Sequence, residues 1–506
     1  MRKFWNVIKS RFFVAAFCIV LEFVELMAVY MLLYTYFMPI TVLAKLFYFF
    51  VFLYIINKDE SVEFKLPWII LVLIFPIAGS FMYILLSSDG YSKTEQQRFN
   101  KHIEICKKFD DDEKLNDLEN SEAYLQAKYL CSSSEISIYG NSNVTYYKIG
   151  EEFHEELLKE LNKAEKFIFM EYFIVAKGKM FSSILDILKE KAKSGVEVYF
   201  MYDDFGCMTT LSESYYKELQ EYGIHAIPSI KFTPKLSTIH NNRDHRKITV
   251  IDGKVGFTGG INLADEYINE IIKHGHWKDT AIKIEGEAVK NLTKLFLGLW
   301  NFQNKEMLKY DKYLNAECKK FENAGLVIPY GDGPSYFYGE NVGKNVYLNM
   351  IHMAKKYVYI TTPYLICDNE LLNALRLASK RGVDVRIITP HVPDKKAIFL
   401  MTRSNYYNLV KDGVKIYEYE SGFIHAKEFV CDDMFATCGT INLDYRSLTH
   451  HFECGAWIYN MSCIKDMKKD IENTIEKSIE INLRRARLKG WKKLLAEFMK
   501  IYTPLM

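Results

Sequence analysis

The sequence predicts two tandem α/β domains with mainly parallel sheets, preceded by N-terminal transmembrane helices. Three observations support this fold class. Long apolar stretches are confined to the first 90 of the 506 residues. From about residue 150 onward, apolar β-rich runs alternate with Lys-rich helical segments, which is typical of βαβ units around a buried sheet. The second half of that region repeats the first at an offset of about 180–190 residues, which indicates two copies of one domain.

The first 90 residues are expected to form a membrane anchor of two to three transmembrane segments. Phe12–Phe37, Ile40–Ile56 and Leu66–Leu86 are apolar and approach the roughly 20 residues that cross a bilayer. The third stretch is the clearest span. The first contains Glu22 and Glu25, and an ionised acid near the bilayer centre costs about 2.5–3.5 kcal/mol on insertion scales. We therefore expect that the first stretch does not cross as an independent span.

The positive charges that flank the apolar stretches predict the sidedness of the protein. Basic residues favour the cytoplasmic side, and with two crossings both ends of the anchor lie there. The protein is then multi-pass, with its catalytic domain in the cytoplasm. Ten cysteines without a CxxC spacing agree with a reducing compartment. The basic residues that set this orientation are Arg2, Lys3, Lys9 and Arg11 before the first stretch, and Lys93, Arg98 and Lys101 after the third.

Residues 91–145 are polar and are expected to form a solvated linker or surface helix. The repeat then defines a first α/β domain over residues 146–320 and a second over residues 321–506. The second ends in a basic amphipathic helix suited to an anionic lipid surface, with an ordinary solvated helix as the alternative. Its basic residues are Arg484, Arg485, Arg487, Lys489, Lys492 and Lys493.

The repeat is visible at the level of individual segments. AEKFIFMEYFIV at 164–175 is echoed by AKKYVYITTPYLI at 354–366. LKEKAKSGVEVYFMYDD at 188–204 is echoed by LRLASKRGVDVRIITP at 375–390. In each copy an apolar run precedes a basic helical stretch, a Gly-Val turn and another apolar run. A duplicated fold of this kind invites a functional site at the interface between the copies.

Each copy then carries the same polar motif at identical spacing. A single HxK triplet arises often by chance, whereas two copies with five matching positions each are a strong signal. Alternation along a strand places His and Lys on the same face. The motif residues are His245, Lys247, Asp252, Gly259 and Asn262 in the first copy, and His425, Lys427, Asp432, Gly439 and Asn442 in the second.

These residue types suit chemistry on a phosphodiester. One neutral imidazole can attack phosphorus while a second, protonated imidazole gives its proton to the leaving oxygen. Lys247 and Lys427 can spread the charge on the phosphate oxygens, so that no metal or other cofactor is needed. The Asn amides can donate to phosphate, and the glycines can allow close approach of the backbone.

Two groups of residues keep alternative interpretations. Asp252 and Asp432 are counted with the catalytic set, but a salt-bridge or turn-capping role is equally compatible with the pattern. His274 and His276 form an HGH pair that could suggest a metal. No further ligand stands at the usual spacing, and a loop is the favoured interpretation. The net charge of +2 and the apolar stretches argue against a nucleic-acid partner.

The ten motif residues resemble the signature of the phospholipase D superfamily, and the chain is similar to its bacterial cardiolipin synthase branch. The similarity extends through LPWIILVLIFPIAGSFMY, MEYFI, YDDFG, HWKDT, TTPYLICDNEL, GFIHAK, GTINLDYRS and HFE, in the order of the family. The resemblance implies transfer of a phosphatidyl group between two phosphatidylglycerol molecules at the bacterial cell membrane. The products are cardiolipin and glycerol, and the intermediate is a phosphohistidine on His245.

The resemblance also implies further roles. His425 becomes the acid that protonates glycerol and the base that activates the second lipid. Asp279 in HWKDT and Glu453 in HFE match the carboxylates that orient the two imidazoles. Two departures from the family pattern are His451, in place of the more usual Asn, and Ser335, in place of Asp. A membrane phospholipase D or another headgroup exchanger, and a silent lipid-binding scaffold, are the alternative functions. Protein partners are unknown from the sequence.

Overall fold

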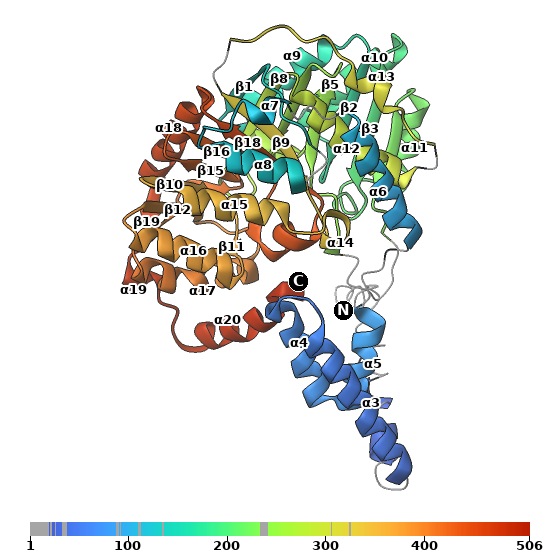
Figure 1. Ribbon diagram of the computed structural model, residues 1–506, viewed down its shortest axis with the longest axis vertical. Coiled ribbons are helices and arrows are strands. Elements are labelled where there is room, and N and C mark those ends of the chain that lie inside the picture. The colour runs from blue at the N-terminus through green and yellow to red at the C-terminus, as the bar shows by residue number, and fades with distance from the viewer. Residues whose placement is uncertain are drawn as a thin grey trace. The chain divides into compact units, whose positions relative to one another are not determined.

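The structure of the protein is a computed structural model, which falls into two compact units (Figure 1). The smaller unit comprises Met1–Gly90, Pro234–Ile239 and Ile501–Met506, and the larger comprises Tyr91–Thr233 and His240–Lys500. The residues that the structure describes are 20, 23–25, 27–32, 38–87, 91, 93–109, 113–133, 136–232, 241–304, 306–322 and 325–505. Most of the apolar stretch Phe12–Phe37, including Glu22, lies outside them.

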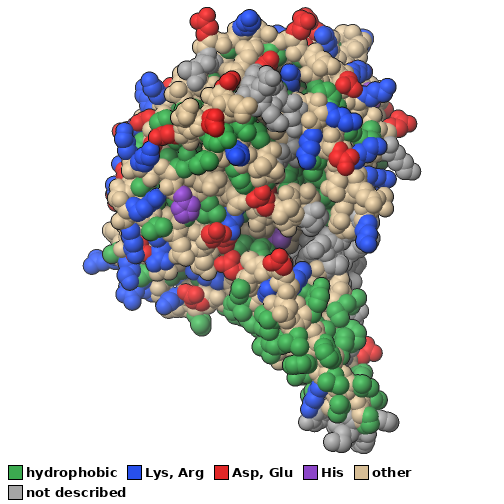
Figure 2. All heavy atoms as spheres, viewed as in Figure 1, with side chains coloured by type: hydrophobic (Ala, Val, Ile, Leu, Met, Phe, Trp, Pro, Cys, Tyr) green, Lys and Arg blue, Asp and Glu red, His purple; other side chains and the backbone are tan. Residues whose placement is uncertain are grey.

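The smaller unit is built on helix α3 (Met38–Asn57), which contains the predicted stretch Ile40–Ile56. Among the described residues, α3 is the one helix that is long and apolar enough to cross a membrane. Apolar side chains cover the visible face of this unit (Figure 2), and Leu43 and Phe50 are 66% and 64% exposed. Such exposure of large apolar side chains marks a surface that faces lipid or a partner.

The expectation of a single span over Leu66–Leu86 is wrong. The stretch forms two shorter helices, α4 (Val62–Ile74) and α5 (Pro76–Leu86), which fold back on each other at Phe75. The rings of Trp68 and Tyr83 lie 5.4 Å apart, whereas 15 residues of continuous helix would separate them by about 22 Å. The break falls before Pro76, because proline cannot donate the next helical hydrogen bond.

A glycine allows the close contact between these two helices. A Cβ atom on Gly79 would lie 2.6 Å from the carbonyl oxygen of Leu71, so only glycine fits. The end of α5 therefore returns to the end of α3, where Tyr54 and Tyr83 are in contact. With α4 only 13 residues long, or about 20 Å, the hairpin is shorter than the roughly 30 Å hydrocarbon layer.

The segment expected to be a solvated linker or a surface helix forms helices that pack one face on the larger unit, in agreement with the second alternative. It forms α6 (Lys93–Lys107), α7 (Glu113–Asn116) and α8 (Tyr124–Ser133). Phe99 and Cys106 of α6 are buried in one core, and Ala127 and Leu130 of α8 are buried in another. Their spacing of three to seven residues places them on one helical face. The residues between these positions are polar, so the apolar face is not evident from the composition of the segment. The predicted domain boundaries stay a prediction.

The first half of the larger unit is a seven-stranded mixed sheet in the order β1-β8-β6-β5-β2-β3-β4. Its elements are β1 (Ser142–Tyr147), α9 (Gly150–Asn162), β2 (Phe167–Tyr172), α10 (Lys179–Lys193), β3 (Glu197–Asp203), α11 (Tyr215–Glu221), β4 (His225–Ser229), β5 (Lys247–Ile251), β6 (Val255–Gly259), η2 (Asp265–Ile268), β7 (His276–Lys278), β8 (Ala281–Gly286), α12 (Val289–Gln303) and α13 (Tyr310–Leu314).

The second half is an eight-stranded mixed sheet in the order β19-β13-β12-β10-β15-β16-β18-β9. Its elements are β9 (Leu326–Asp332), α14 (Ser335–Tyr338), α15 (Val342–Met353), β10 (Tyr357–Thr361), β11 (Leu365–Ile366), α16 (Asn369–Lys380), β12 (Asp384–Pro390), α17 (Lys396–Lys411), β13 (Lys415–Tyr419), β14 (Gly422–Ile424), β15 (Glu428–Cys431), β16 (Phe435–Gly439), β17 (Leu443–Asp444), η3 (Arg446–His450), β18 (Glu453–Tyr459), α18 (Cys463–Glu476), β19 (Ser478–Glu480), α19 (Leu483–Ala486) and α20 (Gly490–Tyr502). The last two residues of α20 and the final element η4 (Thr503–Leu505) belong to the smaller unit.

The prediction of two tandem α/β domains is confirmed, but the sheets are mixed rather than mainly parallel. Parallel pairing is limited, within these two sheets, to β2-β3-β4 and β10-β12-β13. These strands form the βαβ units that the repeat indicated. The motif strands return antiparallel, because tight turns at Asp252 and Asp432 join β5 to β6 and β15 to β16. Such short connections permit only antiparallel neighbours.

The two sheets bury one core between them and separate cores on their outer faces. Along β2, Phe167 and Phe169 point into the shared core, while Ile168 and Met170 face α9 and α10. The shared core also takes Val430 from β15. Both faces of each strand are therefore apolar, which explains the continuous hydrophobic runs in the sequence. The edge where the two halves meet positions the motif residues.

Candidate active site

The first motif histidine precedes β5, and its lysine is the first residue of that strand. His245 is 6% and Lys247 2% exposed. The Lys247 Nζ donates to the carbonyl oxygen of His245 at 2.7 Å, so the two side chains share one side of the strand, as the spacing predicted. The backbone N–H of His245 donates to the carbonyl of Phe452 at 2.9 Å. The second half of the chain therefore holds this segment in place.

The second motif has the same arrangement, but it lies in the second half of the chain and is held by the first. His425 follows β14 and Lys427 precedes β15, and the Lys427 Nζ donates to the His425 carbonyl. The N–H of His425 donates to the carbonyl of Lys278 at 2.7 Å. β14 also pairs in parallel with β7 of the first half. Each histidine is thus carried on backbone that is bonded to the opposite half of the protein.

The carboxylates that orient the two imidazoles cross between the halves. The Nδ1 of His245 lies 2.9 Å and 3.0 Å from the two carboxylate oxygens of Glu453. The Nδ1 of His425 lies 2.6 Å from Asp279 Oδ2. An Nδ1–H that donates to a carboxylate fixes the tautomer and leaves Nε2 for the reaction. Sequence reasoning found both carboxylates but did not assign either of them to a histidine.

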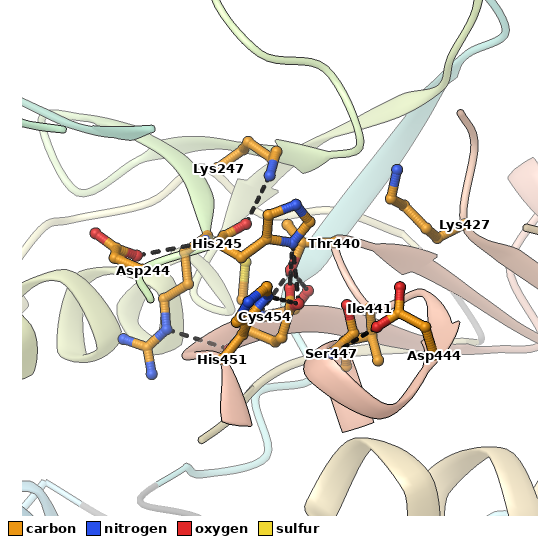
Figure 3. Close-up of polar contacts among 12 residues, drawn as sticks. Asp244, His245, Lys247, Lys427, Thr440, Ile441, Asp444, Ser447, His451 and Cys454 are labelled. Atoms are coloured by element: carbon orange, nitrogen blue, oxygen red, sulfur yellow. Dashed lines mark hydrogen bonds and ion pairs between the residues drawn. The ribbon is translucent and has the colours of Figure 1, made fainter. Parts of the chain in front are cut away.

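Thr440 is a contact residue that sequence reasoning missed. Its hydroxyl donates to Glu453 Oε2, so the carboxylate that holds His245 is itself held. Thr440 and His245 lie close together in Figure 3. The equivalent position of the first half is Gly260, where a Cβ atom would lie 2.1 Å from Asp279 Oδ1. The sequence does show this difference, because the second copy reads GTIN where the first reads GGIN. The two halves therefore fix their carboxylates by different means.

Asp252 and Asp432 do not reach the histidines, which corrects their place in the catalytic set. The Asp252 carboxylate accepts three backbone N–H groups, from Glu165, Lys166 and Phe167. Asp432 accepts the three equivalent ones from Lys355, Lys356 and Tyr357. Each lies at the far end of its motif strand, five residues or about 16 Å from the lysine. The two aspartates therefore have the turn-capping role that the sequence left open, and each fixes its turn to the neighbouring strand.

The motif glycines permit close packing of strands, and their approach to an anion stays a prediction. A Cβ on Gly259 would lie 2.4 Å from the carbonyl oxygen of Thr280, and one on Gly439 would lie 2.5 Å from that of Cys454. Thr280 follows Asp279, and Cys454 follows Glu453. The glycines therefore bring the carboxylate-bearing strands close enough for those carboxylates to reach the histidines.

The two motif asparagines differ in their contacts. The Asn262 side chain is fully engaged with protein: its Oδ1 accepts the N–H of Ile174 at 3.0 Å and its Nδ2 donates to the Tyr267 hydroxyl at 2.6 Å. Asn442 is buried, and its Oδ1 has no hydrogen-bond partner among the described residues. A phosphate-binding role stays a prediction for both asparagines, because the unpartnered Oδ1 of Asn442 is an acceptor and only an amide N–H can donate to a phosphate oxygen.

Burial and repulsion between neighbouring basic groups lower the pKa values of all four basic side chains in the site. Burial, then Lys247, Lys427 and His425, hold the pKa of His245 well below its usual range. Burial and then Lys427 lower the pKa of His425 to about 4. Burial lowers the pKa of Lys247 to about 8 and that of Lys427 to about 7. The site thus combines two neutral imidazoles with two lysine amines. A bound anion would stabilise the protonated form of each amine.

The comparisons with known proteins agree with this geometry. Residues 157–300 and 347–475 match the family described as "Cardiolipin synthase, PLD-like domain". Residues 46–87 match "Phospholipase_D-nuclease N-terminal", which covers most of α3 and all of the α4–α5 hairpin.

Among individual relatives, an uncharacterised protein of Streptococcus mutans is 44% identical and covers 90% of this chain and 99% of its own length. A protein named cardiolipin synthase 2 from Bacillus anthracis is 35% identical, covering 87% and 86%. One named cardiolipin synthase from Alkalihalophilus pseudofirmus is 33% identical, covering 87% and 88%. The crystal structure of Haemophilus influenzae phosphatidylserine synthase has a TM-score of 0.56 at 14% identity, covering 74% of this chain and 96% of that one. That structure supports the fold.

Proposed function

Since the chain belongs to the family of cardiolipin synthases with phospholipase D-like domains, we propose that it is a phosphatidyltransferase that converts two phosphatidylglycerol molecules into cardiolipin and glycerol. The observation that carries the proposal is the pair of crossed contacts between His245 and Glu453 and between His425 and Asp279. Two oriented imidazoles with two buried lysines are the groups that a two-step exchange at one phosphodiester requires.

In the first step the Nε2 of His245 attacks phosphorus. The P–N bond forms as the P–O bond to glycerol breaks, and His425 gives its proton to the departing glycerol oxygen. Lys247 and Lys427 stabilise the charge on the remaining phosphate oxygens. In the second step, the now neutral His425 takes the proton of a hydroxyl on a second phosphatidylglycerol. That oxygen attacks phosphorus, the P–N bond breaks, and His245 is regenerated.

The proton that His425 donates is supplied when substrate binds. The pKa of His425 is lowered to about 4 by burial first and Lys427 next, so the imidazole of the protein alone is neutral near pH 7. An anionic phosphodiester between the two lysines offsets their positive charge and raises the pKa of His425. Protonated His425 is therefore favoured in the complex.

The reaction is tested by giving purified full-length protein vesicles of pure phosphatidylglycerol and identifying the products. Equal amounts of cardiolipin and glycerol support the proposal. Phosphatidic acid with glycerol, in the absence of cardiolipin, would show that water is the acceptor and that the protein is a phospholipase D. No release of glycerol under any condition would point to a lipid-binding scaffold.

We further propose that the chain is integral to the membrane and that its catalytic domain is cytoplasmic. Helix α3 crosses, while the α4–α5 hairpin returns the chain to the side on which α3 ends and contributes no crossing. Lys93, Arg98 and Lys101 favour the cytoplasm for that side, and the basic residues before Phe12 favour it for the N-terminus. Two ends on the same side require a second crossing, and by sequence alone Phe12–Phe37 is the apolar stretch left to supply it. This proposal replaces the sequence expectation that Phe12–Phe37 does not cross and that Leu66–Leu86 does.

A membrane-impermeant thiol reagent on intact cells tests this topology. Among the described cysteines, Cys131 and Cys318 are the ones that are not buried. Because neither is fully exposed, an added cysteine at the exposed position Lys166 makes a sharper reporter. Labelling of Lys166→Cys only after the cells are permeabilised supports the proposal, and labelling in intact cells contradicts it.

Helix α20 is proposed to contact an anionic bilayer surface. Trp491, Leu494 and Phe498 recur every three to four residues and are 69%, 75% and 58% exposed, so they share one helical face. Lys492 and Lys493 on the same helix supply charge attraction to anionic lipid. Leu494→Ala with Phe498→Ala should raise the KM for phosphatidylglycerol in vesicles more than in detergent micelles. Equal KM values for variant and native protein in vesicles would contradict this contact.

A further inference from the structure

A third histidine lies against the His245–Glu453 pair and is not used by the proposed reaction. His451 is 7% exposed, and its ring centroid lies 5.3 Å from that of His245. Its Nδ1 is 3.5 Å from Glu453 Oε1, which is at the limit of a hydrogen bond. Within the described part of the chain, neither ring nitrogen of His451 has a hydrogen-bond partner. A buried polar group without a partner is costly and calls for an explanation.

The donor atoms fit a metal ion of the zinc type. One ligand atom from each of His245, His451 and Glu453 can be chosen so that all three lie within 4.8 Å of one another. The Nδ1 atoms of the two histidines lie 2.9 Å and 3.5 Å from the same oxygen, Glu453 Oε1. Tetrahedral zinc, with bonds of about 2.0–2.2 Å, places neighbouring donors roughly 3.3–3.5 Å apart. Both nitrogen-to-oxygen distances lie within a few tenths of an ångström of these values, and the chosen nitrogens of the two histidines, at most 4.8 Å apart, must close to the same range.

We propose that His245, His451 and Glu453 form an inhibitory binding site for a zinc-type divalent cation. Two imidazoles and one carboxylate are a ligand set that zinc accepts with a water in the fourth position. Mg²⁺ and Ca²⁺ prefer six or more oxygen ligands and are not expected to bind. The nearby lysines oppose any cation, so the site should bind reversibly and more weakly than a structural zinc centre.

Occupancy of this site would stop the reaction at its first step. The metal takes the place of the proton on the Nδ1 of His245, and that proton leaves to solvent. Glu453 then binds the metal and no longer orients the imidazole. The added positive charge also withdraws electron density from the Nε2 that attacks phosphorus. This consequence rests on the proposed function, whereas the binding itself does not.

Metal binding is measured on the full-length protein in detergent, without phospholipid, by titration with Co²⁺ as a spectroscopic substitute for Zn²⁺. We expect visible absorption of a four- or five-coordinate Co²⁺ ion, displaced by Zn²⁺, with one site per chain. His451→Asn should weaken binding on the order of tenfold or more. The matched control is His391→Asn, because His391 also lies 2.9 Å from a carboxylate, that of Glu418, and its loss should leave the titration unchanged.

Several outcomes would overturn the proposal. One is a Co²⁺ spectrum of the six-coordinate aqueous ion, and another is the intense ultraviolet band of a cysteine thiolate ligand. A third is equal affinity in native protein and His451→Asn. His451→Gln serves as a second variant, and the thermal unfolding midpoint of each variant separates loss of the site from loss of the fold.

The activity arm uses phosphatidylglycerol vesicles with and without Zn²⁺. Zn²⁺ should lower the rate of the native protein, and EDTA should restore it, while the residual rate of His451→Asn should be insensitive to Zn²⁺. Equal inhibition of both proteins would place the inhibitory metal elsewhere and contradict the proposal. If the chain fails to act on phosphatidylglycerol at all, the Co²⁺ titration still decides the binding site, so the two proposals fail distinguishably.

Discussion

The Nδ1 of His425 lies 2.6 Å from the Oδ2 of Asp279, although 146 positions of sequence separate the two residues. His245 and Glu453, which are 208 positions apart, form the equivalent contact with the two halves exchanged. Each half of the protein therefore contributes one histidine and the carboxylate that orients the other half's histidine. Neither half holds a complete pair by itself, so the site depends on the packing between them.

Because the two histidines act in one sequence of steps, His245→Ala and His425→Ala should each abolish turnover. The double variant should be no slower than either single variant, since residues that act as a unit show strongly non-additive losses. Product formation from phosphatidylglycerol measures the rates. Rapid quenching with labelled substrate should leave acid-labile label on His245. Label on a Ser, Thr or Asp would refute the phosphohistidine intermediate.

Substitution of Asp279 should affect catalysis, whereas substitution of Asp432 should affect stability. Asp279→Asn removes the charge that orients His425 and should lower kcat by about 10²–10⁴-fold, with little change in thermal stability. Asp432→Asn leaves the histidines untouched but weakens three charge-assisted backbone contacts. It should cost about 1–3 kcal/mol of unfolding free energy with kcat retained. A large kcat loss in Asp432→Asn at full folding would return that residue to the catalytic set.

Gly439 should tolerate no side chain. In Gly439→Ala the added Cβ would meet the carbonyl oxygen of Cys454 at 2.5 Å, so the strand that bears Glu453 must shift. We expect a loss of about 1–3 kcal/mol of stability together with a fall in kcat, measured by denaturant unfolding and by product assay. Gly140→Ala is the control, because a Cβ there has no neighbour within 4 Å. Equal stability of the two variants would contradict the packing role.

The lysines, and not a bound metal, should supply the positive charge for the transferred phosphate. Lys247→Met should lower kcat by about 10²–10³-fold, the usual cost of removing one group that stabilises developing charge. Exhaustive chelation of the native protein should leave its rate intact or raise it. Loss of activity on chelation, restored by one specific ion, would falsify this view once the effects of that ion on the vesicles are controlled.

Acid should destabilise the fold partly through His451. Burial lowers the pKa of His451 to about 3, below its ordinary value near 6.5. Between these values the unfolded chain binds a proton that the folded chain does not. Stability is therefore lost as the pH falls from about 6.5, by up to about 1.4 kcal/mol for each pH unit.

His451→Asn lacks this contribution, so its unfolding free energy should fall less than that of the native protein between pH 6.5 and 4.5. Denaturant titrations of both proteins at each pH measure the difference, and groups distant from His451 cancel in the comparison. Parallel pH profiles would show that His451 is not buried in its neutral form.

The sequence alone determined the features that depend on short-range periodicity. Alternation along a strand placed His245 beside Lys247, and the matched spacing of the second copy predicted the same for His425 and Lys427. Apolar runs between helical segments predicted the two α/β domains, because strands buried on both faces must be continuously apolar. The length and composition of Ile40–Ile56 were sufficient to predict helix α3.

Only the tertiary structure decided the features that depend on contacts between distant segments. It paired Glu453 with His245 and Asp279 with His425, placed Asp252 against backbone amides, and folded α4 onto α5 through the contact of Gly79 with Leu71. Local patterns could not specify these contacts, because each requires two segments whose separation in space is set by the packing of whole sheets and helices. The motif identified the chemical groups, and the meeting of the two halves gave each group its partner.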